Sequence, residues 1–283
     1  MFKTRLQEWL ELSQQKAFKG ELPSYIPLLA QVDRQKIAIA IQYLDKAPLI
    51  EGDVNLAFPL MSVIKPFLLL YLLETKGSEV VFDLVDRQAS SQPFNAIPDR
   101  KPQNPMINSG AIALSSLLAS CESLQNWLNQ RSGANLTIDI EMLDSVRSVA
   151  NRRNLAIADQ LKHLGIVAEP SQALGIYEEI CCLRGNVQDL MQIGTLLIDT
   201  RRSPQMSLNI ATVLEIMTDC GMYEASAAFA QDIGLPSKSS VSGALLSIRP
   251  NRAAIACYSP ALDAIGNSVA GLFLIRQIKN QIM

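Results

Sequence analysis

The stretch "KIAIAIQYL", residues 36–44, determines which class of fold this chain can adopt. Its apolar residues alternate as in a β-strand, and we expect a turn near "EGD" (51–53) and then a short strand, "VNLAF". Two further strands are predicted near the other end of the chain, "SSVSGALLSIRP" (239–250) and "RAAIACYS" (252–259), joined by a Pro-Asn turn. Strands joined by hairpins rather than by crossover helices pair antiparallel, so we expect an antiparallel sheet.

Helical periodicity accounts for most of the remaining chain. Leu6, Trp9, Leu10 and Leu12 mark one side of an amphipathic first helix that stops at Gly20. The other predicted helices span residues 62–76, 110–130, 151–165, 173–183, 187–200, 208–219 and 267–282, the last capped by Asn267 or Ser268.

Strands at both ends and helices between them predict an α+β fold. We expect N- and C-terminal helices to flank the antiparallel sheet, with a helical lobe inserted between the two halves of the sheet lobe. The sheet lobe would comprise residues 1–76 and 203–283, and the helical lobe residues 77–202.

Composition excludes several classes of protein. The chain has 283 residues, of which 48% are hydrophobic, enough for one large domain or two closely packed lobes. A net charge of −2 without a basic run argues against nucleic-acid binding. The longest apolar runs, 67–73 and 269–275, are too short to cross a bilayer, and the N-terminus is not expected to be a signal peptide.

The five cysteines do not form a recognisable framework. Their odd number, with Cys181 and Cys182 adjacent and no C-x-x-C, argues against both disulfides and a zinc site. We therefore expect reduced core cysteines in a cytoplasmic protein. The single histidine, His163, lies near the end of a predicted helix, where a capping or dipole role is expected rather than a catalytic one.

The candidate chemistry lies in "FPLMSVIKPF" (58–67), where Ser62 and Lys65 are three residues apart in an apolar run. On a helix these two side chains share a face. A Ser–Lys pair can transfer an acyl group without histidine if burial lowers the pKa of the lysine. A helix beginning near Ser62 would help to stabilise an oxyanion, and Pro66 is tolerated in its first turn.

Spacing alone leaves a structural alternative open. Ser13 and Lys16 also match S-x-x-K, on a helix expected to face solvent, so a helix start with a lysine reaching to the surface is a competing interpretation. Tyr223 after a predicted helix end could be a packing residue, and Asn108 or Ser109 a helix cap. The apolar neighbours favour Ser62 over Ser13.

The segments taken together resemble the serine-dependent glutaminase family, whose fold is similar to that of serine β-lactamases and penicillin-binding proteins. The matching pieces cover the chain from Gly20 to Gly271 in order: "SYIPLLA" (24–30), "FPLMSVIKP" (58–66), "FN" (94–95), "NPMINSGAIA" (104–113), "RNLAIA" (153–158), "YEEICCL" (177–183), "CGMY" (220–223), "GLPSKSSV" (234–241) and "SPALDAIGNSVAG" (259–271).

The resemblance implies hydrolysis of the glutamine side-chain amide to glutamate and ammonia through an acyl-serine. It implies Ser62 as nucleophile, Lys65 as its proton partner and Tyr223 as a proton relay to the leaving ammonia. It assigns the remaining residues as follows: Tyr25 lines the site, the backbone N–H groups of Ser62 and Val241 form the oxyanion hole, and Asn108, Asn154 and Tyr177 hold the amino-acid end of the substrate. It also implies a homodimer or homotetramer that uses neither a metal nor an organic cofactor.

Two departures from the family pattern raise alternatives. The family has a glutamate for the substrate's α-ammonium seven residues before the asparagine of "RN", and here that position is Arg147. Opposite charges about 4 Å apart attract by roughly 4 kcal/mol at an effective dielectric of about 20, and an arginine would replace this with repulsion. The family's Gly-rich strand is Lys238–Ala244 here, whose added side chains are expected to narrow the site. A related acyl-serine enzyme of altered substrate, or a non-catalytic binding protein, therefore remain alternatives to a glutaminase.

Overall fold

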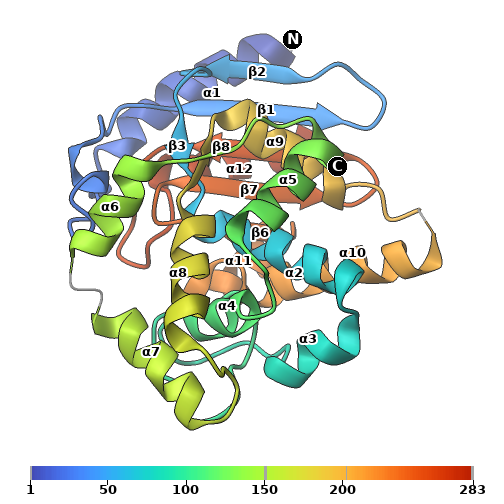
Figure 1. The fold of residues 1–283 in the computed structure, drawn as a ribbon. Coiled ribbons are helices and arrows are strands. Elements are labelled where there is room, and N and C mark those ends of the chain that lie inside the picture. The colour runs from blue at the N-terminus through green and yellow to red at the C-terminus, as the bar shows by residue number, and fades with distance from the viewer. Residues whose placement is uncertain (1, 150–151, 202, 282–283) are drawn as a thin grey trace.

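A five-stranded antiparallel sheet in the order β2-β1-β8-β7-β6 organises the molecule (Figure 1). The computed structural model describes residues 2–149, 152–201 and 203–281. The strands of this sheet are β1 (Ala38–Tyr43), β2 (Leu49–Gly52), β6 (Ser237–Ser239), β7 (Ala244–Arg249) and β8 (Ala253–Tyr258). Since β1 pairs with β8 over its full length, from Ala38 opposite Tyr258 to Tyr43 opposite Ala253, the two ends of the chain meet in the middle of the sheet. The predicted α+β class is confirmed.

Helices cover both faces of this sheet and build the remainder of the molecule. They are α1 (Phe2–Ala17), α2 (Lys65–Thr75), α3 (Ser78–Leu84), α4 (Asn108–Ser115), α5 (Cys121–Ser132), α6 (Ile140–Ser148), α7 (Arg152–His163), α8 (Pro170–Cys181), α9 (Val187–Gly194), α10 (Pro204–Cys220), α11 (Ser226–Asp232) and α12 (Val269–Ile278). A smaller sheet pairs β3 (Phe58–Pro59) and β4 (Thr137–Ile138) with β5 (Leu183–Gly185). None of the helices in the described ranges is long and apolar enough to cross a membrane.

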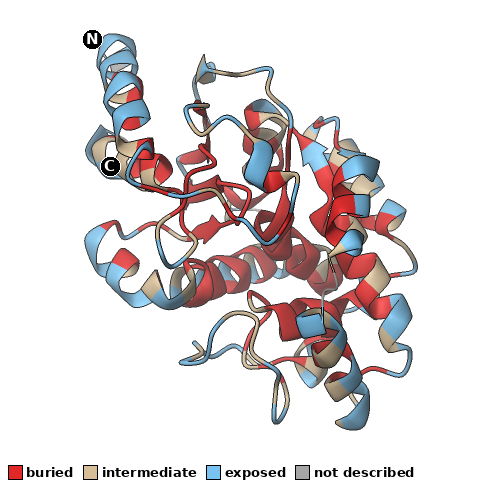
Figure 2. Cartoon of the chain, turned by 90° about the vertical axis from the view of Figure 1, so that its left-hand side faces the viewer, coloured by how far each residue is buried: buried red, intermediate tan, exposed pale blue. Residues whose placement is uncertain are grey.

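The alternation along β1 separates two hydrophobic cores. Ile37, Ile39 and Ile41 pack with residues of α1 and α12, whereas Ala38 and Ala40 belong to the core shared with the helices on the opposite face. Side chains of a strand point alternately to its two faces, so one strand serves both cores. Figure 2 shows the buried strands between helices whose outer surfaces are exposed.

Several predicted ends of strands and helices differ from those in the structure. The turn expected near 51–53 is present at residues 53–55, directly after β2, but only Phe58 of the expected strand "VNLAF" lies in a strand. The predicted helix 110–130 is two helices, because the Ser116 hydroxyl donates to the carbonyl of Ala113 where α4 ends. The predicted strand 239–250 is interrupted at Gly243, whose φ of +91° and close contact with the Ser259 carbonyl exclude a side chain.

The buried face of α1 also differs from the prediction. Leu6 and Leu10 are buried as expected, but Leu12 is exposed, and Ser13 lies in the core instead of facing solvent. The Ser13 hydroxyl donates to the carbonyl of Trp9, which makes its burial possible without an unpaired polar group. Ser268, rather than Asn267, caps α12 by accepting a hydrogen bond from Gly271 N–H. The predicted helix ends at residues 151 and 282 lie outside the described residues.

All five cysteines are free and buried, as predicted. They are distributed over α5, α8, the turn after it, α10 and β8. His163 lies in the last turn of α7, where it was expected.

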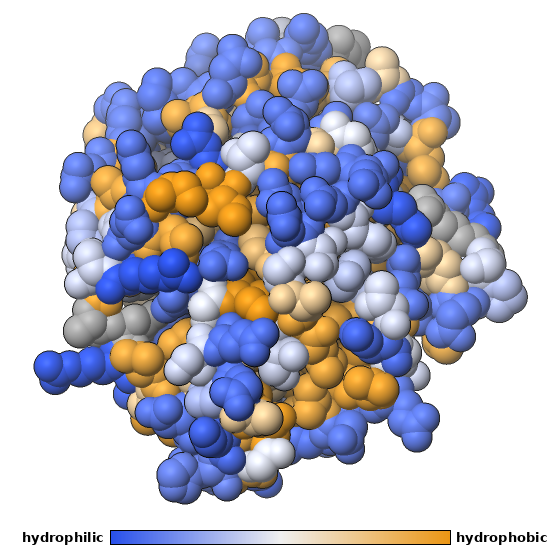
Figure 3. All heavy atoms as spheres, in the orientation of Figure 1, coloured by the Kyte–Doolittle hydropathy of each residue, from blue (hydrophilic) through white to orange (hydrophobic). Residues whose placement is uncertain are grey.

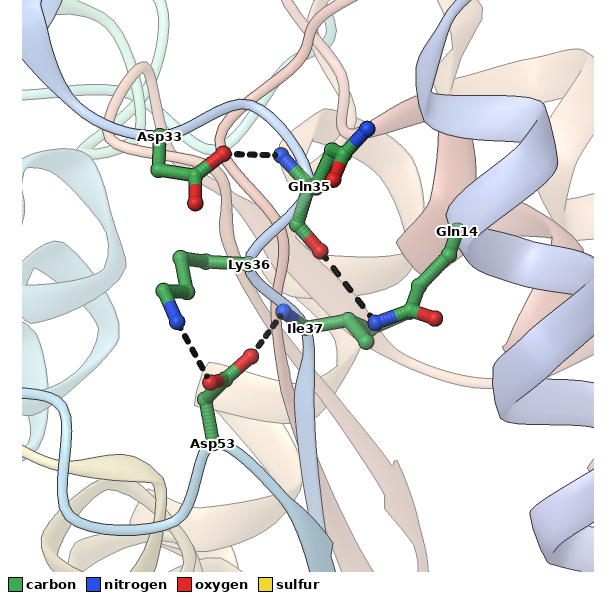
Figure 4. Close-up of polar contacts among 6 residues, drawn as sticks. All are labelled: Gln14, Asp33, Gln35, Lys36, Ile37 and Asp53. Atoms are coloured by element: carbon green, nitrogen blue, oxygen red, sulfur yellow. Dashed lines mark hydrogen bonds and ion pairs between the residues drawn. The ribbon is translucent and has the colours of Figure 1, made fainter.

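The start of β1 is fixed by the carboxylate of Asp53, at the end of the β1–β2 hairpin (Figure 4). Its Oδ2 accepts a hydrogen bond of 3.0 Å from Ile37 N–H, and its Oδ1 lies 2.9 Å from Lys36 Nζ. Nearby, Gln14 of α1 donates a longer bond to the Gln35 carbonyl. Burial raises the pKa of the Asp53 carboxyl, but the two hydrogen bonds and the lysine charge outweigh this, and the net shift is downward.

We expect Asp53→Ala to lower the free energy of unfolding by about 1–2 kcal/mol at pH 7, because a charge-assisted hydrogen bond and an ion pair are lost. The folded-state pKa of Asp53 is depressed. Its stabilisation is therefore present above about pH 4 and is lost as the pH falls through the folded pKa. Urea denaturation between pH 7 and pH 3 measures this.

Asp45→Ala, which removes an exposed aspartate near the same hairpin, is the matched control and should change stability by less than about 0.5 kcal/mol. Equal effects of the two substitutions would contradict the role given to Asp53.

Candidate active site

Ser62 lies on a short 3₁₀ turn, Met61–Ile64, and Lys65 is the first residue of α2, which follows this turn directly. The Lys65 N–H donates to the Ser62 carbonyl, which is the i to i+3 hydrogen bond of a 3₁₀ turn, so the backbone places the two residues one tight turn apart. Met61 has a backbone φ of +47°, which is uncommon for a residue other than glycine. Such strained backbone conformations are typical of functional turns. Ser62 is 6% exposed and Lys65 is fully buried.

The serines of the 238–244 segment support this turn and do not narrow the site. The Ser240 hydroxyl donates to the carbonyl of Leu60 at 2.8 Å, and its oxygen lies 2.9 Å from the Ser242 hydroxyl. Leu60 N–H donates in turn to the carbonyl of Leu183 in β5. Neither serine is among the described residues that line the cavity, whereas Val241 is. The expected narrowing is therefore wrong.

The amine of Lys65 is held by acceptors from α4 and the loop before it. Lys65 Nζ donates to the Met106 carbonyl at 3.1 Å and to Asn108 Oδ1 at 2.8 Å. Asn108 Oδ1 also accepts from the Tyr177 hydroxyl at 3.0 Å, and Asn108 Nδ2 donates to Asn154 Oδ1 at 3.0 Å. Asn108 is therefore not a helix cap as expected: Ile107 is the N-cap of α4, and the Asn108 side chain joins α2, α7 and α8.

Burial makes Lys65 an unusually weak base for a lysine. Removal from water lowers its pKa to about 8, against a small opposing effect from Cys181. A substantial fraction of the amine is consequently neutral near physiological pH.

A second buried lysine, Lys238 of β6, was expected only as part of a polar strand edge. Its Nζ donates to the carbonyls of Gly221 and Ser239 at 3.0 and 2.6 Å and lies 4.5 Å from the centre of the Tyr223 ring. Burial is the main cause that holds the pKa of Lys238 well below its usual range, and the nearby charge of Lys65 lowers this pKa further. Sequence spacing offers no signal for such a contact.

Tyr223 follows the end of α10 and contacts Ser62. Its φ of +55° is a left-handed conformation that is strained for an aromatic residue, and its ring packs 4.8 Å from that of Phe94. Burial raises the pKa of the Tyr223 hydroxyl, whereas its hydrogen bond with Ser62 works in the opposite direction. The same hydroxyl donates to the carbonyl of Ser239 at 3.3 Å.

A cavity of about 540 Å³ opens at Ser62. This volume suits a small metabolite. Its described lining residues are Tyr25, Ile26, Met61, Ser62, Phe94, Asn95, Asn108, Val146, Val149, Arg152, Arg153, Asn154, Tyr177, Glu178, Cys181 and Val241. Helices α6, α7 and α8 lie on the face drawn in Figure 1, where Figure 3 shows hydrophobic residues interspersed among polar ones.

Most of the predicted site residues thus come together. Ser62, Asn108, Asn154, Tyr177 and Val241 line the cavity, as does Tyr25, whose side chain is largely exposed. Lys65 is fully buried, and its backbone N–H donates to the Ser62 carbonyl. Tyr223 is outside the described lining but touches Ser62. The described residues contain no group of three His, Cys, Asp or Glu side chains placed to hold a metal ion.

Arg147 of α6, the main departure from the family pattern, is not among the described residues that line the cavity. Its Nε lies 3.2 Å from Glu178 Oε2, and its Nη2 lies 3.4 Å from Glu179 Oε1. Two carboxylates of α8 therefore balance the arginine charge, and one of them, Glu178, reaches the cavity. Sequence reasoning assigned no role to Glu178, although two acidic residues directly after Tyr177 were a visible signal.

Comparisons with known proteins agree with the site. The glutaminase family profile matches residues 20–283. A glutaminase from Synechocystis sp. is 38% identical over 282 residues, which cover 95% of this chain and 86% of the relative. Glutaminase 2 from Bacillus subtilis is 34% identical, with 91% of this chain and 89% of the relative covered.

A solved structure, a probable glutaminase from Bacillus subtilis complexed with 6-diazo-5-oxo-L-norleucine, superposes with a TM-score of 0.88 at 27% identity. The match covers 99% of this chain and 94% of that one. The chain therefore belongs to the glutaminase family.

Proposed function

We propose that this protein hydrolyses the side-chain amide of L-glutamine to L-glutamate and ammonia through an acyl intermediate on Ser62. The observation that carries the proposal is that Ser62 lines a substrate-sized cavity and is followed, one tight turn later, by the fully buried Lys65, whose N–H donates to the Ser62 carbonyl. Relatives that carry the glutaminase name, and a related structure complexed with the glutamine-like 6-diazo-5-oxo-L-norleucine, support the choice of substrate.

The contacts of Lys65 suit a general base. A neutral amine has two N–H bonds and one lone pair, and the Met106 carbonyl and Asn108 Oδ1 accept the two N–H bonds. The lone pair is then left to take the proton of the Ser62 hydroxyl. Its pKa of about 8 allows it to hold that proton briefly and return it.

The reaction then proceeds in two balanced halves. The Ser62 oxygen forms a bond to the amide carbon as its proton moves to Lys65, and the N–H groups of Ser62 and Val241 stabilise the oxyanion. The C–N bond breaks when the leaving nitrogen receives a proton through Tyr223, so ammonia departs. Water next attacks the ester carbon, its proton returns to Ser62 through the same groups, and glutamate is released.

The other lining residues bind the substrate. We assign Asn108, Asn154 and Tyr177 to the amino-acid end, and Tyr25 to the mouth of the cavity, where it is 55% exposed. Cavity residues come from both halves of the proposed division, with Ser62 and Val241 in the sheet lobe (1–76 and 203–283) and the others mostly in the helical lobe (77–202).

Cellular location and assembly are part of the same proposal. Free, buried cysteines are consistent with a reducing cytoplasm. The expectation of a homodimer or homotetramer rests on the family resemblance. A molar mass in solution near that of the single 31.0 kDa chain would contradict this expectation.

We expect Ser62→Ala to reduce ammonia release from L-glutamine by at least about 10³-fold while the protein stays folded, because the attacking oxygen is removed. The matched control is Ser13→Ala, the serine of the other S-x-x-K sequence, which lies in α1 and should leave the rate within about twofold. Coupled detection of ammonia, with circular dichroism for folding, measures both. Retained activity in Ser62→Ala would eliminate the acyl-serine route, whereas covalent labelling of wild-type Ser62 without ammonia release would favour an altered substrate.

The rate should depend on the ionisation of Lys65. Because the neutral amine is the active form and its pKa is about 8, kcat/KM should rise roughly tenfold per pH unit below pH 8 and then level off. Initial rates between pH 6 and pH 8.5 test this. A profile that is flat down to pH 6 would show that a group of lower pKa takes the proton.

A further inference from the structure

Glu178 is the one carboxylate among the described residues that line the cavity. It follows Tyr177 in α8, and the Tyr177 hydroxyl is hydrogen-bonded to Asn108, which in turn contacts Asn154. Glu178 therefore lines the cavity from the same helix, α8, that carries Tyr177 to the end assigned to the amino-acid part of the substrate. L-glutamine carries an α-ammonium group there, and an ammonium entering a largely desolvated pocket requires a negative partner.

The carboxylate of Glu178 is held in a defined orientation. Its Oε2 lies 3.2 Å from Arg147 Nε, and its side chain is 11% exposed against 43% for Arg147. The arginine thus fixes the carboxylate from the more exposed side, while the glutamate faces the cavity. Arg152 and Arg153 also line the cavity and offer positive charge for the α-carboxylate of the same substrate.

A purely structural ion pair with Arg147 is the competing explanation. Glu179 is already within 3.4 Å of the same guanidinium, with a side chain that is 32% exposed, and it is not among the described lining residues. An ion pair alone would need no carboxylate in the cavity, so the placement of Glu178 has an additional use.

We propose that Glu178 binds the α-ammonium group of the substrate and that Arg147 is its positioning residue. The inference rests on the proposed function and names how this chain recognises an α-amino acid although an arginine stands where its family has the ammonium-binding glutamate. The carboxylate comes from α8, and the arginine of α6 serves to orient it.

The test compares L-glutamine with glutaramate, which has the same side-chain amide and carboxylate but no α-amino group. We expect Glu178→Gln to lower the ratio of kcat/KM for glutamine to that for glutaramate by about 10- to 100-fold, mostly through KM, because only glutamine loses an ionic partner. Glu178→Asp, which keeps the charge on a shorter side chain, should recover part of the ratio.

Glu179→Gln is the matched control, because it removes the other carboxylate that pairs with Arg147 and leaves the described cavity lining unchanged. It should leave the ratio of kcat/KM for glutamine to that for glutaramate within about twofold. If Glu178→Gln slows both substrates equally, or if Glu179→Gln shifts the ratio as much, Glu178 is a structural partner of Arg147 and the proposal is overturned.

A binding measurement separates this proposal from the proposed reaction. Calorimetry with L-glutamate and with glutarate requires no turnover: weaker glutamate binding by Glu178→Gln, with glutarate unchanged, supports the ammonium site even if wild type releases no ammonia. Equal losses for both ligands, or none, overturn it whatever the activity.

Discussion

The burial of the Lys65 amine is the constraint on which the rest of the site depends. A lysine with no exposed surface is tolerated only if its hydrogen-bonding groups find partners and its charge can be given up. Met106 and Asn108 supply the acceptors, and Asn108 is in turn held by Tyr177 and Asn154. One buried amine therefore ties α2, α4, α7 and α8 into a single arrangement, and the lowered pKa that results is what makes it usable as a base.

The sheet supplies the other half of the same arrangement. β6 and the turn after it bring Ser240 against the Leu60 carbonyl, and so brace the strained residue, Met61, that precedes the nucleophile. Val241, between the two turned-away serines, is left facing the cavity. Ser240 and Ser242 replace glycines of the family pattern. Their hydroxyl groups lie within hydrogen-bonding distance of each other, and that of Ser240 also donates to the Leu60 carbonyl.

Local patterns in the sequence predicted much of this, and side-chain pairing, some of it long-range and some of it within one helix, explains the remainder. The alternation in β1 and the spacing of Ser62 and Lys65 are properties of neighbouring residues. The strand was predicted correctly, whereas the predicted helix begins as a 3₁₀ turn at Ser62 and becomes α-helical at Lys65. The pairing of Arg147 with Glu178 joins residues 31 positions apart on two helices, and no local pattern reports it. The exchange of Leu12 for Ser13 in the core has a local origin, because a hydroxyl bonded to a carbonyl of its own helix can be buried. The broken helix at Ser116 followed from a side-chain hydrogen bond that competes with helix formation.

Partitioning of the acyl group between water and hydroxylamine distinguishes cleavage of glutamine through an acyl group on Ser62 from direct hydrolysis. L-glutamine and the γ-methyl ester of L-glutamate would form the same acyl-serine, which then reacts with either nucleophile. A shared acyl-serine predicts that both substrates give γ-glutamyl hydroxamate and glutamate in one identical ratio at a given hydroxylamine concentration. Ratios that differ between the two substrates, or the absence of enzymatic hydroxamate, would contradict it.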